Sequence, residues 1–278
     1  MIEPNFSESQ LQQLVNTEIT LRLLQAGRGM FLPVVISLPE EAVSGWDTGF
    51  FFPWLTAPGL DDHRGCNFFL QYKLANFLEG RRAGEWSFWR EPYFRFRIPH
   101  HSKDPSTGDY FEDYHQLDAL RGIAAKGYPV FFVANRTPYE ARLFEIAKAQ
   151  QLLDTQLFVG IEATLRNHRH VTFTETAPHC YLHSSPEGRR LSDWGDILER
   201  SLESGASELS RTVTELEIMV RNAEERRGTP DRLRLDAVYE RVGREDRRIS
   251  WTARATLVAM RLRQEMNVWW FRHREATG

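Results

Sequence analysis

Residues 67–74 read Asn-Phe-Phe-Leu-Gln-Tyr-Lys-Leu, and this stretch decides the fold that we predict. It is short and nearly continuously apolar, which is typical of a buried β-strand. Near its end the run turns polar at alternate positions. Because successive side chains of a strand point to opposite faces of the sheet, Gln71 and Lys73 are expected on one face and Tyr72 on the other.

The residues before this run predict a helix and two further strands. The helix is expected over 8–26, because Ser7 is a suitable N-cap, the segment lacks Gly and Pro, and Gly27 ends it. One strand is expected over 31–38, which is rich in β-branched and aromatic residues, and another over 46–52, after a Ser-Gly turn. With the run above, these strands form a three-stranded meander that follows the helix.

Helices and strands alternate in the residues that follow. In chain order we expect a strand over 93–98, a helix over 109–126, a strand over 128–134, a helix over 138–152 and a strand over 156–162. Residues 163–190 are irregular and rich in histidine. Alternation of this kind after a meander predicts a mixed α/β core.

Strand patterns end near residue 188, and helices are predicted beyond it. Apolar residues recur at alternating spacings of four and three over 202–223, which is a heptad stripe. Further helices are expected over 231–242 and 250–269. We therefore predict an α/β domain over 1–188 and a helical module over 189–278. The stripe either closes on the last helix within the chain or pairs with another chain.

The composition limits the class of protein. The 278 residues are 41% apolar and 26% charged with a net charge of −3, which excludes a polycationic coat for nucleic acid. Cys66 and Cys180 are the only cysteines and cannot build a disulfide framework, which suits a reducing compartment. No apolar run approaches the ~20 residues of a membrane helix, and the first residues carry no apolar signal core. We expect a cytoplasmic protein with no membrane partner.

Two carboxylates and the end of the central strand suggest chemistry. Glu18 lies on the apolar face of the first helix. Either it pairs with an arginine or the face is only half buried, or else it faces a metal or an active centre. Asp47 opens the second predicted strand, and Gln71 and Lys73 end the third. At one edge of a sheet, carboxylate and amide oxygens can bind a divalent metal, and an ammonium can stabilise charge developing on a phosphate.

This arrangement resembles the PD-(D/E)xK nuclease superfamily over about residues 7–160, and most closely its Mrr-like variants, in which Gln replaces the second acid. The matching pieces are helix-borne Glu18, then Gly45-Trp46-Asp47, then Gln71-Tyr72-Lys73. Trp46 stands where the family has Pro, and the 23 residues between Asp47 and Gln71 require an insertion. The resemblance implies a restriction-endonuclease-like mixed sheet flanked by helices, and hydrolysis of phosphodiester bonds with Mg²⁺, or Mn²⁺ as an alternative ion.

On this resemblance, Glu18, Asp47, Gln71 and Lys73 are the candidate catalytic residues, and Glu18 and Asp47 are the metal ligands. The first hypothesis is a Mg²⁺-dependent nuclease that cuts DNA, with RNA left open, as the effector of a bacterial defence or restriction-type complex. The alternative is a catalytically inactive nuclease-fold adaptor that docks partner proteins through its helical module. On the predicted helix 109–126, His115 and Gln116 either assist the site or are ordinary surface residues.

The partners follow from the same hypothesis. The chain carries no ATPase, methylase or helicase motif of its own, so a motor or sensor would lie on a separate subunit. We predict a homodimer or a hetero-complex with such a subunit, with its interface drawn mainly from residues 190–278.

A segment dense in aromatic residues and arginine, 85–98, is the candidate nucleic-acid surface. Arginines bind phosphates, while interleaved aromatic rings stack on bases. The candidate binding residues are Arg81, Arg82, Arg90, Arg95 and Arg97. Alternatively, the aromatic rings are core residues and the arginines are their solvated edge.

Histidines crowd the segment after the last predicted strand. The group consists of His168, His170, His179, Cys180 and His183. Zn²⁺ accepts both residue types, although the spacing matches no familiar zinc motif. Alternatively, these polar side chains are solvated at the surface or packed by hydrogen bonds.

Overall fold

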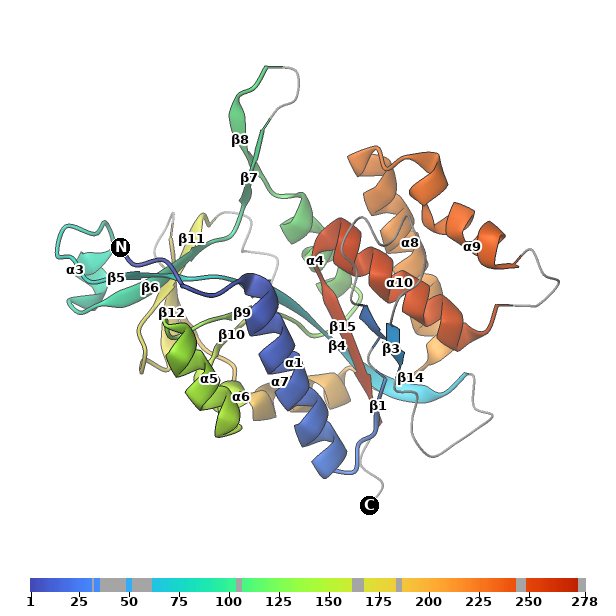
Figure 1. Ribbon diagram of the computed structural model, residues 1–278, viewed down its shortest axis with the longest axis horizontal. Helices are drawn as coiled ribbons and strands as arrows, with labels where there is room; N and C mark the ends of the chain where they lie inside the picture. Colours follow the sequence, from blue (N-terminus) through green and yellow to red (C-terminus); the bar gives the residue numbers. More distant parts are fainter. Residues whose placement is uncertain are drawn as a thin grey trace. The chain divides into compact units, whose positions relative to one another are not determined.

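The computed structural model describes residues 1–31, 33–35, 49–51, 62–103, 107–161, 168–183, 187–243 and 249–274. The chain is a mixed α/β protein with a helical C-terminal region, as predicted (Figure 1). It divides into two compact units, one of residues 1–22 and 70–200 and one of residues 23–69 and 201–278. This division differs from the predicted boundary at 188, because residues 23–69 group with the C-terminal segment.

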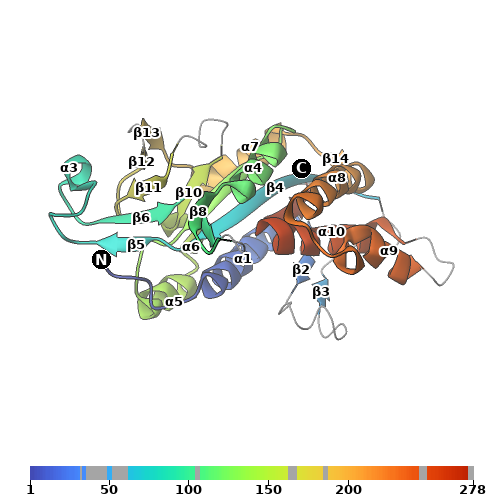
Figure 2. The same cartoon turned by 90° about the horizontal axis from the view of Figure 1, so that it is seen from above.

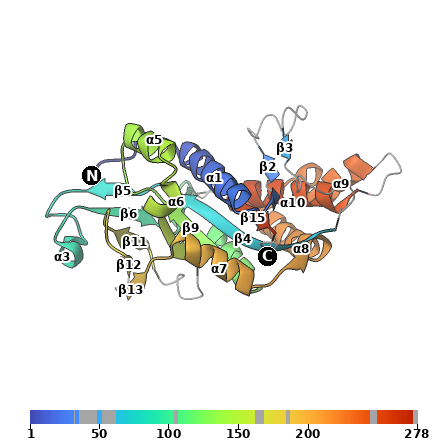
Figure 3. The same ribbon diagram turned by 90° about the horizontal axis from the view of Figure 1, so that it is seen from below.

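The first unit contains the end of the central strand, β4 (Arg64–Lys73), followed in the sheet by β9 (Val130–Ala134) and β10 (Leu157–Gly160). Four helices flank these strands. On one side lie α1 (Glu8–Gln25) and α5 (Glu140–Lys148), and on the other α4 (His115–Ala124) and α7 (Trp194–Glu203) (Figures 2 and 3). The predicted helix α1 is confirmed together with its N-cap, because Ser7 Oγ accepts a hydrogen bond from the Gln10 backbone N–H at 3.1 Å.

A five-stranded antiparallel sheet forms the other half of the first unit. Its order is β13 (Glu187–Arg190), β12 (His179–His183), β11 (His170–Phe173), β6 (Tyr93–Arg97) and β5 (Asn76–Leu78). The prediction of irregular structure over 163–190 is therefore wrong. The short strands β11 and β12 bury Val171, Phe173, Cys180 and Leu182 at alternate positions, and this alternation provides the missing strand signal.

Two predicted boundaries shift in the first unit. The helix expected over 109–126 begins only at α4, because β7 (His100–Lys103) pairs with β8 (Tyr110–Asp113) in a hairpin. The single helix expected over 138–152 is shorter: α5 ends at Lys148, and a separate helical turn, α6 (Leu152–Thr155), follows it. Gln150 between them has a φ of 56°, which breaks the helix.

The second unit places the first part of β4 beside β15 (Trp269–His273), which pairs with β1 (Met30–Phe31). The short strands β2 (Pro33–Val35) and β3 (Gly49–Phe51) pair with each other, and in the described residues neither is a neighbour of β4. Of the predicted three-stranded meander, the pairing of the first two strands is confirmed, whereas in the described residues β4 lies in another sheet. The helix expected to reach residue 269 ends at 266, because Asn267 adopts a left-handed φ of 56° and β15 follows. The ring of Phe271 of β15 stacks on the ring of Phe68, and the two ring centres are 4.8 Å apart.

Helices complete the second unit. α8 (Leu209–Arg227) packs on α10 (Trp251–Met266), with α9 (Leu235–Gly243) and the turn η2 (Asp231–Leu233) beside them; the short strand β14 (Ser207–Glu208) pairs with β4. The central residues of the predicted stripe, Leu209, Val213, Leu216 and Val220, are fully buried. The stripe thus closes on α10 within the chain, which is one of the two alternatives that the sequence left open.

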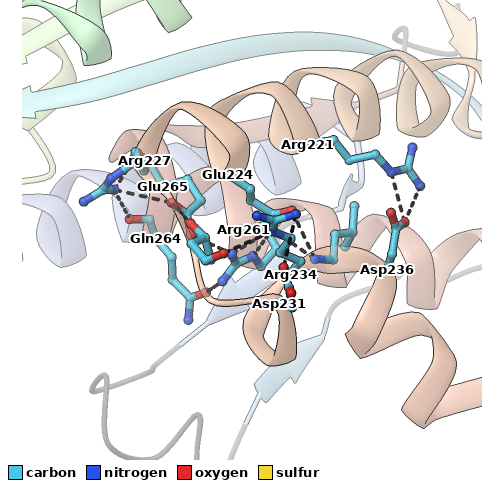
Figure 4. A network of polar contacts seen from close by, with 11 residues as sticks. Arg221, Glu224, Arg227, Asp231, Arg234, Asp236, Arg261, Gln264 and Glu265 are labelled. Carbon is cyan, nitrogen blue, oxygen red and sulfur yellow. Dashed lines mark hydrogen bonds and ion pairs between the residues drawn. The ribbon is translucent and has the colours of Figure 1, made fainter.

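Buried ion pairs join α8 and α10 (Figure 4). Arg261 donates to the carboxylate of Glu224 at 2.7 Å and to that of Glu265 at 2.6 Å. Glu224 also accepts the backbone N–H of Leu235 at 3.0 Å. Because buried charges are tolerated only when they are paired, these contacts fix how α8, α9 and α10 pack. Among the described residues, no helix combines the length and apolar character that crossing a membrane requires.

Candidate functional site

The predicted site lies at the end of β4, in the first unit. Gln71 is 1% exposed and Lys73 is 6% exposed, so the polar end of this strand is buried with the apolar part. A lysine is rarely buried to this degree, because removing its ammonium from water is costly. Burial lowers the pKa of Lys73 to about 8, and the nearby charge of Glu8 partly offsets this effect. The Lys73 Nζ lies 5.8 Å from the centre of the Phe132 ring.

Polar residues on the inner face of α1 accompany this end of β4. Glu8, Gln12 and Asn16 are spaced four apart and therefore lie along one line of the helix. Gln12 donates to Glu8 at 2.8 Å, and the hydroxyl of the fully buried Tyr72 donates to Asn16 at 2.5 Å. Our reading of the sequence missed Gln12 and Asn16. The signal that could have found them is this polar row on an otherwise apolar helix face.

Gln71 is held by a residue of α4. Its Nε2 donates to the Oε1 of Gln116 at 2.8 Å. An amide pair of this kind fixes the orientation of both side chains. Gln116 thus contacts a residue of the predicted site, while its role as an auxiliary residue stays a prediction. The side chain of His115 lies outside the described residues.

Glu18 pairs with an arginine, which is one of the possibilities that the sequence left open for it. Its carboxylate is 2.8 Å from the guanidinium of Arg22 and accepts the backbone N–H groups of Leu152 at 2.7 Å and Leu153 at 3.3 Å. Arg22 also binds Asp154 at the surface. Both oxygens of Glu18 are thus engaged by donors of the protein, which anchors α6 to α1. We therefore leave Glu18 out of the site proposed below.

Asp47, the other predicted metal ligand, lies outside the described residues, as do Gly45 and Trp46. Within the ranges that the structure does describe, no three His, Cys, Asp or Glu side chains are grouped to hold a metal ion. With Glu18 engaged elsewhere, the described residues do not by themselves fit Mg²⁺. The role of Asp47 stays a prediction.

The candidate arginines lie around the short helix α3 (Trp86–Trp89) and on β6. Arg81, Arg82, Arg90 and Arg97 are exposed. Arg95 is partly buried and bonds to Glu85 at 3.2 Å, so it is the arginine most clearly used in packing. Phe94 and Phe96 face the core, as the alternative interpretation of this segment requires, whereas Phe88 is 43% exposed.

The histidine cluster is built into the five-stranded sheet. His170 of β11 lies opposite His183 of β12 in the strand register. The Nε2 of His183 is 2.7 Å from the hydroxyl oxygen of Thr172. Cys180 is fully buried, and its burial raises the pKa of its thiol to about 12. Cys180 alternates with His179 and Tyr181 along β12, so it points into the core, to the face opposite the histidine side chains. The contact with Thr172 shows hydrogen-bonded packing for His183, and zinc binding by the group stays an untested alternative.

Comparison of the chain with protein-family models, curated proteins and solved structures finds no match.

Proposed function

We propose that the protein is a nuclease that hydrolyses phosphodiester bonds, with Lys73 at the reaction centre and with the restriction-endonuclease-like fold that the sequence implies. The observation that carries this proposal is the buried Lys73 at the end of the central strand, with its pKa lowered to about 8. Buried ionisable groups with shifted pKa values cluster at functional sites, because catalytic groups need pKa values that match their chemistry.

The environment of Lys73 suits the stabilisation of phosphate charge. Its ammonium is still mostly protonated at neutral pH, since the pKa of about 8 lies above it. In a site of low dielectric, such a charge interacts more strongly with a developing oxyanion than it would in water. Tyr72 and Asn16 support the same end of β4, and Gln116 orients Gln71. These contacts support a preorganised site rather than a mobile surface lysine.

The resemblance also implies Mg²⁺ or Mn²⁺. We assign no step to the ion, since Glu18 is engaged by Arg22 and by backbone N–H groups and Asp47 lies outside the described residues. Metal dependence and the role of Asp47 are tested by cleavage with and without EDTA and by Asp47→Ala. The placement in a defence or restriction-type complex with a separate ATPase or sensor subunit remains part of the same hypothesis.

The test is cleavage of labelled DNA and RNA by the purified chain. Lys73→Met keeps most of the length of the unbranched side chain and removes its charge. We expect it to slow cleavage by on the order of 10²–10³-fold, the typical effect of removing one positioned electrostatic group. Lys126→Met is the matched control, because Lys126 is exposed at the end of α4.

Full cleavage by folded Lys73→Met would refute the proposal, and so would equal losses in both variants. A chain that binds nucleic acid but never cuts it would instead match the adaptor alternative.

A further inference from the structure

One face of the five-stranded sheet is polar and aromatic, although the segments that form it lie far apart in the sequence. The register places Thr172 between Arg95 and Tyr181, and His170 between Arg97 and His183. Paired residues of neighbouring strands point to the same face of a sheet. The opposite face is the apolar core, so the remaining face carries arginine, histidine, threonine and tyrosine side by side.

Helix α3 lies over this face and adds two large rings to it. Trp89 stacks on His179 with ring centres 5.2 Å apart, and its Nε1 donates to Thr172 at 2.9 Å. Phe88 contacts the rings of Tyr181 at 5.7 Å and His183 at 5.2 Å. We call Phe88, Trp89, His179 and Tyr181 the aromatic patch.

The aromatic patch is accessible at its outer side. Phe88 is 43% exposed, and Trp89, His179 and Tyr181 are partly exposed. Beside His179 there is an open hollow of about 520 Å³, which is lined by Pro178, His179, Gly188, Arg189 and Arg190. A ring of the patch and two arginines therefore border one hollow.

The two segments that supply the patch carry a surplus of positive charge in a chain that is negative overall. Segment 79–97 holds five arginines against three glutamates, and segment 168–190 holds three described arginines against two glutamates. The surplus of three positive charges contrasts with the net charge of −3 for the chain. The carboxylate of Glu187 lies 3.1 Å from the guanidinium of Arg189 and offsets its charge. The neighbouring Arg190 is exposed.

We propose that this face binds single-stranded nucleic acid, with bases stacked on the aromatic patch and phosphates on the surrounding arginines. Aromatic rings stack on the flat faces of bases, which a single strand exposes and a duplex covers. The arginine surplus complements the phosphate backbone. The inference deepens the proposed function by naming its substrate class, and it rests on that function for the choice of nucleic acid.

The test is fluorescence anisotropy with a labelled 12-nucleotide single strand, as DNA and as RNA, and with the matching duplex. It is done in EDTA on the whole chain, with intact oligonucleotide checked on a gel. We expect Phe88→Ala to weaken binding of the single strand by about fivefold or more, as the loss of one stacked base does. Phe144→Ala is the matched control, because Phe144 of α5 is 47% exposed and lies outside the patch.

A second variant tests the phosphate contacts. Arg190→Ala is expected to weaken binding and to reduce the slope of log affinity against log salt by about 0.7, the value for one phosphate contact to a single strand. The inference is overturned if neither single strand binds, if the duplex binds more tightly, or if Phe88→Ala and Phe144→Ala behave alike.

The two proposals fail separately. Loss of cleavage in Lys73→Met with unchanged binding in Phe88→Ala would support the nuclease function and refute nucleic-acid binding by this face. Binding that depends on Phe88, in a chain that never cleaves, would support nucleic-acid binding by this face and refute the nuclease function.

Discussion

At the scale of single residues, Lys73 is the most informative side chain. Its position at the polar end of a buried strand could be predicted from the sequence, because the alternation of residues 67–74 is visible there. Its burial could not be predicted, since its surroundings come from residues far away in the sequence, such as Glu8 and Phe132. The structure shows a 6% exposed lysine whose pKa burial lowers to about 8.

This burial has a consequence for stability. The pKa of Lys73 is about 8 in the folded chain and about 10.5 when unfolded, so between these values the unfolded chain binds more protons. The cost of burying the charge is therefore fully present below pH 8 and disappears as the pH rises to about 10.5. We expect Lys73→Met to be more stable than wild type at pH 7, by on the order of 3 kcal/mol.

Urea denaturation of both chains at pH 7 and pH 10 measures this difference. The advantage of the variant should shrink at the higher pH. A difference that does not change with pH would contradict the lowered pKa. Because other titrating groups are common to both chains, their effects cancel in the comparison.

Glu18 illustrates how one carboxylate on an apolar helix face permits two interpretations from sequence. The structure pairs it with Arg22 and with the start of α6. We expect Glu18→Gln to lower the free energy of unfolding by about 1–3 kcal/mol, since hydrogen bonds to a charged group are weakened. Calorimetric titration with Mg²⁺ should be unchanged, and exposed Glu3→Gln serves as the control. A loss of metal binding with no loss of stability would restore the metal-ligand interpretation.

At the scale of elements, long segments with clear patterns could be predicted and short strands could not. The helix α1 and the strands β4, β6, β9 and β10 lie near their expected places. The strands β11 and β12 were missed, because each has only two inward apolar residues and the outward positions are polar or aromatic, most of them histidine. β15 was assigned to the preceding helix, since its aromatic residues continue the helical spacing until Asn267 breaks it.

The ion pairs between α8 and α10 could not be predicted either, because their partners lie 37 residues apart. Arg261→Met removes the cation that pairs with the buried carboxylate of Glu224, and it leaves Glu265 with Arg227 alone, at 3.6 Å. We expect a loss of about 3–5 kcal/mol in the free energy of unfolding, which is typical of breaking a buried pair from one side. Exposed Arg232→Met should have little effect. Equal stability of the two variants in urea would show that the network contributes no stability.

At the scale of the whole molecule, the predicted homodimer or hetero-complex remains a prediction. The buried stripe of α8 is satisfied within the chain, so an interface within 190–278 would have to use other residues, such as Ile218, which is 51% exposed. We expect light scattering to give twice the chain mass and Ile218→Glu to reduce it, with Thr214→Glu, at another exposed position of α8, as the control. A monomer at all concentrations that recovers no partner subunit would contradict this prediction.

The most direct test of the central claim is the pH dependence of cleavage. If Lys73 acts through its charge, the wild-type rate should fall about tenfold per pH unit above a pKa near 8. Lys73→Arg keeps its charge at every accessible pH, so any activity that it retains should lack this fall. The claim is contradicted if the wild-type rate rises steadily from pH 7 to pH 10, or if both chains lose activity with the same alkaline pKa.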